Sequence, residues 1–332
     1  MAKEISDTTL AEEGYVYSAY GSEKYLKHAV ASVTSLRRYD KKRPAAIYCS
    51  SELRACLEKS EAGSLFEYVF DLPDENQSIN GFKHNIHLFM PFERNLILDS
   101  DMIWCKNPDR LWLSLSPFPF TITGNQLSDL FFGSSKGISV IKDLILNKRK
   151  KTLDRFGLTY LSRVQAGMIY AQDPDLARRV SDEAKTYFSL RNETHFRSRT
   201  DETGRIDESC EWSMAMAMSK MKLQVFPWLN GFDSPQLDFL ESYTEYDPDF
   251  HSVSCLYYTQ RLVYDLKGLK SDWFRNLLIR LITKIPGRGD YLYVTPYCIH
   301  FGWVHQKEPL NQFSVRCWSA FKKRNSLEKT AS

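Results

Sequence analysis

Short apolar runs alternate with helical patterns through the N-terminal third of the chain, and this alternation constrains the fold most. Residues 15–18, 45–49 and 67–70 have the apolar character of buried strands. Between them, residues 26–36 place apolar side chains at helical spacing, and residues 51–62 predict a charged helix. The order strand, helix, strand, helix, strand predicts an α/β protein, Rossmann-like, with a mainly parallel mixed sheet flanked by helices.

The pattern continues with a further buried strand. A helix is expected up to Phe89, Pro91 ends it, and the apolar residues 95–98 lead directly into Asp99. Further strands are expected at residues 166–170, 223–226 and 291–299, and further helices at residues 174–188, 211–221 and 273–285. Residues 125–160 lack a strand pattern and carry the basic run 148–151, so we expect a helical or mobile excursion there.

Charge and composition exclude several classes of protein. The 44 basic and 41 acidic residues give a net charge of +3, too even for a nucleic-acid-binding protein. The N-terminus lacks the apolar segment of a signal peptide, and the longest uncharged stretch, residues 111–128, contains Pro117 and Pro119, so no transmembrane helix is expected. Seven scattered cysteines without a Cys-x-x-Cys pair are expected to be reduced. Together these features predict a cytoplasmic protein.

Two carboxylates, Asp99 and Asp101, interrupt the apolar run from Leu96 to Trp104. Burying two like charges without a cation is costly, so binding one metal ion would give the pair a physical role. In an extended segment, residues i and i+2 lie on one face about 7 Å apart at Cα, and both can reach that ion. Hard oxygen ligands suit Mn²⁺ or Mg²⁺. The alternative is two solvated acids at the end of a strand.

With this motif the chain resembles the GT-A glycosyltransferases, most closely the retaining enzymes of family 8. In that family an Asp-x-Asp after an apolar strand holds Mn²⁺ and the donor diphosphate, and Asp99 and Asp101 match it. A His near the C-terminus completes the family's metal site, and His300 is similar in position. The resemblance therefore implies a metal site made of these three residues.

The resemblance also implies groups that bind a nucleotide-diphosphate sugar, with a UDP-sugar favoured. They comprise the end of the first strand, a tyrosine that stacks on the base, a basic residue before the motif, the residue inside the motif, a segment similar to the family's Asn-Ala-Gly, and a lysine after the His. The corresponding residues are Ser18, Ala19, Tyr20, Tyr25, Lys83, Ser100, Gln165, Ala166, Gly167 and Lys307.

The candidate catalytic residues are Asp207 and Glu208, which stand where the family has an Asp-Gln pair near the anomeric carbon. A carboxylate at Glu208 could stabilise an oxocarbenium-like transition state or act as a nucleophile. The implied reaction is a metal-assisted transfer of a sugar, with retention, to a carbohydrate or lipid-linked acceptor.

On this interpretation residues 1–310 form one GT-A catalytic domain with a helical C-terminal extension. Residues from about 14 to 125 are its nucleotide-binding half and residues from about 160 to 310 its acceptor half, with the excursion at about 125–160 between them. Residues 311–332 are expected to form a basic tail that includes Lys322, Lys323 and Arg324.

Other functions share part of this pattern. A haloacid-dehalogenase-like phosphatase also has two aspartates after an apolar strand, although there the pair usually lies on the first strand. A sugar-phosphate nucleotidyltransferase would normally open with a Gly-rich loop, which this sequence lacks. A non-catalytic carbohydrate-binding subunit is the non-enzymatic alternative.

One helical pattern suggests a peripheral membrane contact through residues 273–288. Its apolar positions form one stripe at residues 274, 277, 278, 281, 282 and 285, with Arg275, Arg280, Lys284 and Arg288 expected to flank it. Such a helix can lie in an anionic membrane interface, although the same stripe is normal for a helix that packs on a sheet.

Overall fold

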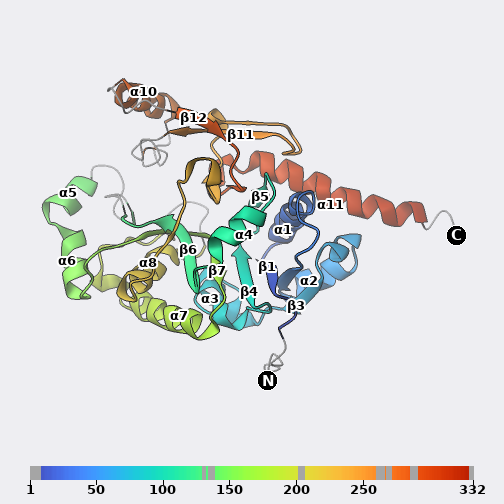
Figure 1. Cartoon of the computed structure of the whole chain (residues 1–332), viewed down its shortest axis with the longest axis horizontal. Helices are drawn as coiled ribbons and strands as arrows, with labels where there is room; N and C mark the ends of the chain where they lie inside the picture. The colour runs from blue at the N-terminus through green and yellow to red at the C-terminus, as the bar shows by residue number, and fades with distance from the viewer. Residues whose placement is uncertain are drawn as a thin grey trace.

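The computed structural model describes residues 9–128, 132–133, 139–200, 206–258, 266, 271–284 and 291–328. Its strands form three sheets, with helices around the largest of them (Figure 1). The strands are β1 Glu13–Ala19, β2 Ala45–Cys49, β3 Tyr68–Asp71, β4 Arg94–Leu98, β5 Met102–Trp104, β6 Phe120–Asn125, β7 Arg163–Ala171, β8 Phe226–Pro227, β9 Gln236–Asp238, β10 Thr244–Tyr246, β11 Val253–Tyr258, β12 Tyr291–Val294 and β13 Cys298–His300. The α-helices are α1 Glu23–Leu36, α2 Ser51–Glu58, α3 Ile79–Lys83, α4 Asp109–Leu115, α5 Ser139–Ile145, α6 Lys148–Arg155, α7 Pro174–Ser189, α8 Glu211–Lys220, α10 Asp272–Thr283 and α11 Glu308–Glu328.

The main sheet has seven strands in the order β3-β2-β1-β4-β7-β6-β8. β1 pairs in parallel with β2 and β4, β2 pairs in parallel with β3, and β6 does so with β8. Only β7 runs antiparallel to its neighbours, β4 and β6, among the described strands of this sheet. The predicted α/β class, with a mainly parallel mixed sheet flanked by helices, is confirmed.

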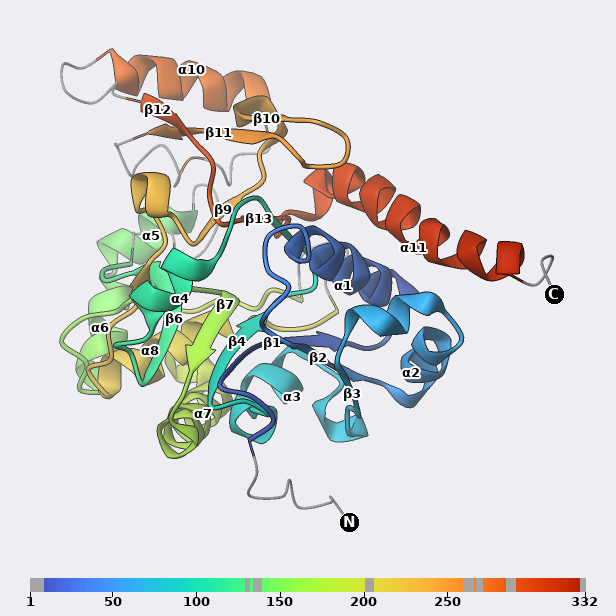
Figure 2. The same ribbon diagram turned by 45° about the vertical axis from the view of Figure 1, so that its right-hand side comes forward.

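Alternate residues of the central strands enter two cores on opposite faces of the sheet. Tyr15 and Tyr17 of β1 pack in one core, together with apolar side chains of α1, α2, α4 and α11. Val16 enters the other, with side chains of α3, α7 and α8. Figure 2 shows the sheet between these two groups of helices. Because successive side chains of a strand point to opposite faces, strands covered on both faces are apolar throughout.

Two smaller sheets lie beyond the main one. One has the order β5-β13-β9 and the other the order β10-β11-β12. The strand expected at residues 291–299 is therefore two strands, β12 and β13, which belong to different sheets. The helix expected at residues 51–62 ends earlier, at Glu58, and a 3₁₀ turn follows at Glu61–Leu65.

Several elements are not predicted by the sequence pattern. They are α4, β5, β6, β9, β10 and β11, of which β6 lies in the uncharged stretch 111–128. Between residues 125 and 160 the described residues form α5 and α6. All seven cysteines are free thiols. Among the described residues we find no helix with the length and apolarity needed to cross a membrane.

The C-terminal segment contains the long helix α11, which packs along α1 (Figures 1 and 2). Its buried side chains recur every three or four residues, which is the spacing of one helix face. They are Leu310, Phe313, Ser314, Cys317 and Trp318. The side chains of Lys322, Lys323 and Arg324, and all of residues 329–332, lie outside the described residues.

The packing of α11 predicts a large effect of truncating Phe313, which is 2% exposed and contacts the ring of Phe250. We expect Phe313→Ala to lower the free energy of unfolding by about 3 kcal/mol, because a buried aromatic ring leaves a cavity. Val315 on the same helix is 54% exposed, and Val315→Ala should change that free energy by less than about 0.5 kcal/mol. Denaturant unfolding of both variants measures the difference; equal effects would show that α11 does not belong to the core.

Candidate metal centre

Asp99 and Asp101 lie where the chain passes from the main sheet to a small one. β4 ends at Leu98 and β5 begins at Met102, so Asp99, Ser100 and Asp101 form the corner between two sheets. The backbone fixes both aspartates: Asp99 N donates to Gly167 O at 2.9 Å, and Asp101 O accepts from Phe301 N at 3.0 Å. The two carboxylates do converge, but through a turn at residues 100–101 and not through the extended segment that we predicted.

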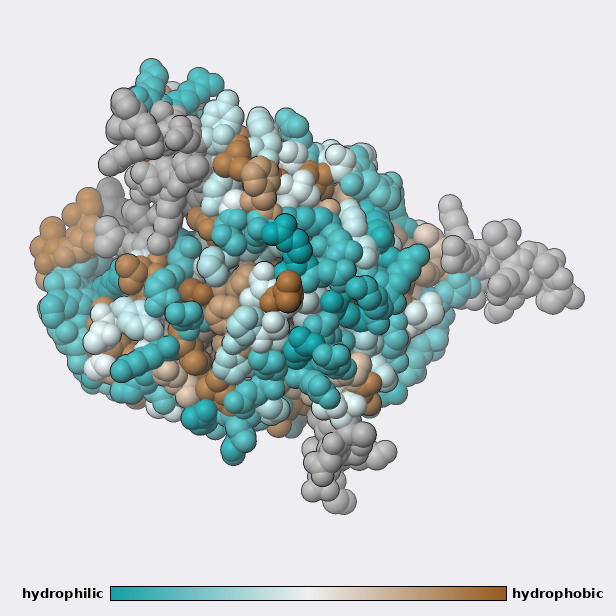
Figure 3. All heavy atoms as spheres, viewed as in Figure 1, coloured by the Kyte–Doolittle hydropathy of each residue, from teal (hydrophilic) through white to brown (hydrophobic). Residues whose placement is uncertain are grey.

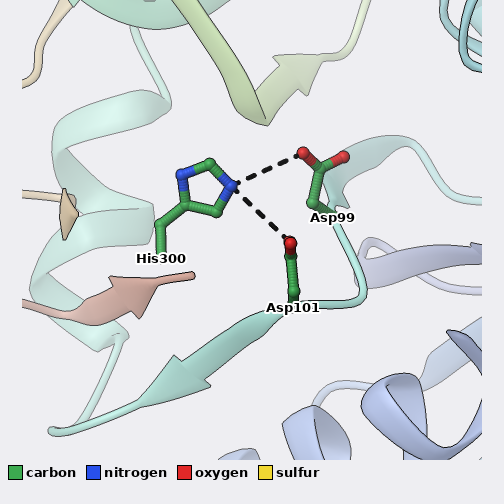
Figure 4. Close-up of side chains that lie close together, drawn as sticks. All are labelled: Asp99, Asp101 and His300. Carbon is green, nitrogen blue, oxygen red and sulfur yellow. Dashed lines mark ion pairs between the residues drawn. The ribbon is translucent and has the colours of Figure 1, made fainter. Parts of the chain in front are cut away.

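His300 faces both carboxylates from β13 (Figure 4). β13 pairs with β5 so that His300 is opposite Met102, which brings its ring beside the corner. Its Nε2 lies 3.7 Å from Asp99 Oδ2 and 3.5 Å from Asp101 Oδ1. One potential ligand atom from each of the three residues lies within 4.8 Å of the others. The three residues predicted to bind a metal are thus brought together.

Two lysines pair with the carboxylates of the cluster. Lys83 Nζ, at the end of α3, lies 2.6 Å from Asp99 Oδ1 and donates to Ala166 O at 2.7 Å. Lys307 Nζ lies 2.5 Å from Asp101 Oδ2. Lys83 was predicted to bind the donor and Lys307 its diphosphate, and both lysines lie at the edge of the proposed metal site.

These charges explain the protonation of the cluster. Burial alone would raise the pKa of Asp101, but Lys307 and His300 hold that pKa well below its usual range. The pKa of Asp99 is also lowered, because Lys83 and His300 outweigh its burial and the repulsion of Asp101. Burial opposes the charged form of His300, yet its hydrogen bonds to Asp101, Asp238 and Asp99 raise its pKa well above 6.5. The carboxylates around His300 therefore favour the protonated form of its imidazole.

Asp238 completes the cluster and was not found in the sequence. It ends β9, whose parallel pairing with β13 places it opposite His300. Its Oδ1 lies 3.2 Å from His300 Nδ1, and its Oδ2 accepts from Trp303 Nε1 at 3.3 Å. A carboxylate on the outer nitrogen of a metal-binding imidazole fixes the ring and directs the other nitrogen to the ion. The only signal in the sequence was a single acid between Leu237 and Phe239, without the second aspartate that identified Asp99.

The segment Gln165-Ala166-Gly167 of β7 forms the floor of the cluster. The Gln165 amide nitrogen lies 2.9 Å from His300 Nδ1 and donates to Asp238 Oδ1. A Cβ on Gly167 would lie 3.0 Å from Gln236 Oε1 and 3.3 Å from His300 Nε2. This close approach is the physical reason for a residue without a side chain beneath the imidazole.

The residues predicted for the nucleoside lie at the end of β1. Ser18 and Ala19 are its last residues, and β1 lies beside β4 in the parallel part of the sheet. Tyr20 follows; burial, and then the charges of Asp207 and Asp99, raise the pKa of its hydroxyl. Tyr25 on α1 is 40% exposed. Neighbouring parallel strands thus end at the same edge, where α/β proteins bind their ligands.

The structure places Asp207 and Glu208 in different surroundings. Asp207 Oδ2 accepts from Ile79 N at 3.2 Å, at the start of the helix that carries Lys83. The Glu208 carboxylate pairs with Arg191 at 2.6 Å and accepts from Arg199 N at 2.8 Å. Ser198 Oγ also donates to Glu208. No contact described for Glu208 joins it to the aspartates or the imidazole of the cluster.

Comparison with known proteins finds similarity at the level of structure alone. No protein-family model matches the chain, and no curated protein matches it. Among solved structures, mouse xyloside xylosyltransferase 1 in its apo form is 11% identical, over 70% of this chain and 88% of that chain, with a TM-score of 0.47. The galactosyltransferase LgtC with donor and acceptor sugar analogues is 9% identical, over 94% and 95%, with a TM-score of 0.49. The glycosyltransferase GlyE of Streptococcus pneumoniae TIGR4 is 11% identical, over 96% and 64%, with a TM-score of 0.47.

The contact of Asp238 with His300 predicts a change in titration. We expect Asp238→Asn to lower the pKa of His300, because a negative charge beside the ring is removed. The pKa of His300 exceeds 6.5, so its charge stabilises the fold fully below that pH and this stabilisation is lost as pH rises through the folded pKa. In the Asp238→Asn variant, the stabilisation by the charged imidazole should be lost at a lower pH than in the wild type.

Proton NMR of the imidazole Cε1–H across pH measures this pKa, with His300→Gln assigning the signal. Asp233→Asn is the control, because Asp233 pairs with the exposed Arg110. An unchanged His300 pKa in Asp238→Asn would show that Asp238 does not act on the ring.

Proposed function

We propose that this protein is a metal-dependent glycosyltransferase of the GT-A type that moves a sugar from a nucleotide-diphosphate sugar to a carbohydrate or lipid-linked acceptor, with retention. A UDP-sugar is the favoured donor. The observation that carries the proposal is the convergence of Asp99, Asp101 and His300, with Lys83 and Lys307 beside them, at the edge where β1 and β4 end. Acidic and basic groups that meet there can bind a cation and a polyanion together.

The donor set fits Mn²⁺ or Mg²⁺. Two carboxylates and one imidazole offer two hard oxygens and one nitrogen, a combination that Mn²⁺ accepts readily and Mg²⁺ accepts with more oxygen or water. When bound, the ion would neutralise charge that develops on the departing nucleoside diphosphate. His300 must lose its proton to be a ligand, and the hydrogen bond to Asp238 keeps its Nε2 directed at the aspartates.

The chain's own residues supply the remaining functions. The ammonium groups of Lys83 and Lys307 pair with Asp99 and Asp101. When donor binds, they would pair with its phosphates instead. Ser18, Ala19, Tyr20 and Ser100 border the nucleotide, and the exposed ring of Tyr25 offers a face to the base. Gln165, Ala166 and Gly167 lie beneath the transferred sugar, and Gly167 carries no side chain that would approach His300 Nε2.

We assign different roles to the two candidate catalytic acids. Asp207 accepts from Ile79 N at the start of the helix that carries Lys83, so we place its carboxylate on the side of the sugar. Glu208 binds Arg191 and the segment 198–200, so it holds that segment in place. Acidic side chains that hold a loop affect catalysis through geometry, whereas one beside the reacting carbon affects the transition state directly.

Removing one metal ligand tests the metal site. We expect Asp101→Ala to weaken UDP binding in the presence of Mn²⁺ by at least about 100-fold, because both the ion and the diphosphate lose a contact. The fold should persist, since the carboxylate lies at a corner and contributes little to the core. Isothermal titration calorimetry with and without Mn²⁺ measures the affinity. Asp233→Ala is the control, and unchanged affinity in Asp101→Ala would remove the metal site from the proposal.

Paired variants separate the roles of the two acids. We expect Asp207→Asn to lower kcat by about 100-fold with little change in donor affinity. Glu208→Gln, which loses the ion pair with Arg191, should lower kcat by less than about tenfold and also reduce thermal stability. Steady-state kinetics of sugar release and thermal unfolding measure both. The reverse order of kcat losses would make Glu208 the catalytic acid, as the motif alone predicts.

A further inference from the structure

Helix α10 carries the segment for which the sequence predicted a membrane contact. Its Arg275 is 1% exposed; the guanidinium lies over the ring of Tyr243 and donates to Ser242 Oγ at 3.3 Å. Contrary to the prediction from sequence, Arg275 therefore does not flank an apolar stripe at the surface. Residues 285–288 lie outside the described residues. The membrane contact through residues 273–288 stays a prediction.

A buried histidine on α1, His28, contacts the first turn of α11. His28 is 0% exposed, whereas Figure 3 shows mainly hydrophilic side chains at the surface in the region of α1 and α2. Its Nε2 lies 3.0 Å from Asn311 Oδ1. Burial lowers the pKa of His28 to about 4, so the ring is neutral at pH 7 and carries one N–H. Because the amide oxygen of Asn311 only accepts, that proton is on Nε2 and His28 is the donor.

The other ring nitrogen shows that core stability does not account for this histidine. Among the described residues, none forms a hydrogen bond with the buried Nδ1 of His28. A buried acceptor without a partner opposes folding, and an apolar side chain of similar size would avoid that cost. The one hydrogen bond described for the ring goes to Asn311. We therefore look for the role of His28 in that contact.

Asn311 is one helical turn after Lys307. Asn311 N donates to Lys307 O at 2.9 Å, and residues four apart on a helix are neighbours on one face. The Lys307 side chain is 15% exposed, and its Nζ lies 2.5 Å from Asp101 Oδ2. The hydrogen bond from His28 fixes this first turn of α11, and with it the direction in which the Lys307 side chain leaves the backbone. A continuous series of contacts thus joins His28 to the metal centre.

His28 also contacts the residue that we assign to the base of the donor. Tyr25 precedes it by one turn of α1, and the two ring centroids are 6.3 Å apart with their planes at 86°. His28 therefore contacts Tyr25 directly and Lys307 through Asn311. These are the residues assigned to the two ends of the nucleoside diphosphate.

We propose that His28 is a positioning residue that, through Asn311, holds Lys307 where it meets the diphosphate of the donor. A lysine side chain has many rotamers, and restricting them before the donor arrives lowers the entropic cost of binding. The inference rests on the proposed function, because it assigns Lys307 to a nucleotide donor. His28 acts through Lys307 and is not itself a catalytic residue.

The mobility of Lys307 in the ligand-free protein tests the positioning. Heteronuclear NMR of lysine labelled at Cε, with Lys307→Arg assigning the signal, should show a restricted side chain in the wild type. His28→Leu keeps a buried side chain but loses the N–H, so we expect the order parameter of Lys307 to fall. His28→Gln, whose amide can donate to Asn311, should restore it. An equal order parameter in His28→Leu and wild type would overturn the proposal.

Matched variants separate positioning from general damage to the core. Asn311→Ala removes the same hydrogen bond from a partly exposed position and should free Lys307 as His28→Leu does. Ser32→Ala is the control, because Ser32 is also buried on α1 but its hydroxyl donates to Tyr17 Oη. Thermal unfolding of His28→Leu should resemble that of the wild type, since the variant also removes the unpaired Nδ1.

Calorimetry with UDP and Mn²⁺ tests the consequence for the donor. We expect His28→Leu to weaken UDP binding by about fivefold and His28→Gln by about twofold or less, because a lysine must then be ordered on binding. In a Lys307→Ala background, His28→Leu should cause no further loss. Additive losses would show that His28 does not act through Lys307. A wild type that binds no UDP would contradict the proposed function instead, while the NMR measurement still decides whether His28 positions Lys307.

Discussion

The negative charges of Asp99 and Asp101 lie close together where β4 passes into β5. The residues around this corner must therefore supply positive charge. Burial opposes the ionisation of both acids, and positive charge close by more than offsets this effect on their pKa values. Lys83, His300 and Lys307 provide that charge from a short helix, a three-residue strand and the segment before α11. Lys83 precedes His300 and Lys307 by more than 200 positions in the chain, so the fold brings distant segments together at this corner.

The first half of the sheet was predictable from sequence because its strands are continuous apolar runs, and β1, β2 and β4 are almost entirely buried. β1, β2, β3 and β4 are short apolar runs separated by helical patterns, and that signal is local. By contrast, β5, β9 and β13 have three residues each and are held by pairing with distant strands, so no period appears in the sequence. This difference explains why Asp99 was identified while Asp238, which touches the same histidine, was missed.

The order of motifs in the sequence predicted which residues come together better than it predicted the direction in which each side chain points. The motifs predicted that Asp99, Asp101 and His300 would share one site, and the structure brings these three residues together. The motifs assigned both lysines to the donor, and the structure pairs the lysines with the two aspartates. The motifs gave no information on the direction of Glu208, because Arg191 and the backbone at Arg199 decide it. Similarly, periodicity in α10 showed that a stripe exists, but only the burial of Arg275 against Tyr243 shows which face the protein covers.

The packing of α11 along α1 ties the order of folding to the order of synthesis. His28 on α1 hydrogen-bonds to Asn311 at 3.0 Å, and Phe313 and Trp318 complete a core that also contains Tyr15 and Leu26. At ribosomal rates, the last helix emerges roughly 15–60 s after the first one. Throughout that interval the side chains of α1 that pack against α11 are not yet covered by it. A nascent chain of this protein therefore exposes a long, specific apolar surface to the cell, and any transcript cut short before α11 yields a product that keeps that surface permanently uncovered.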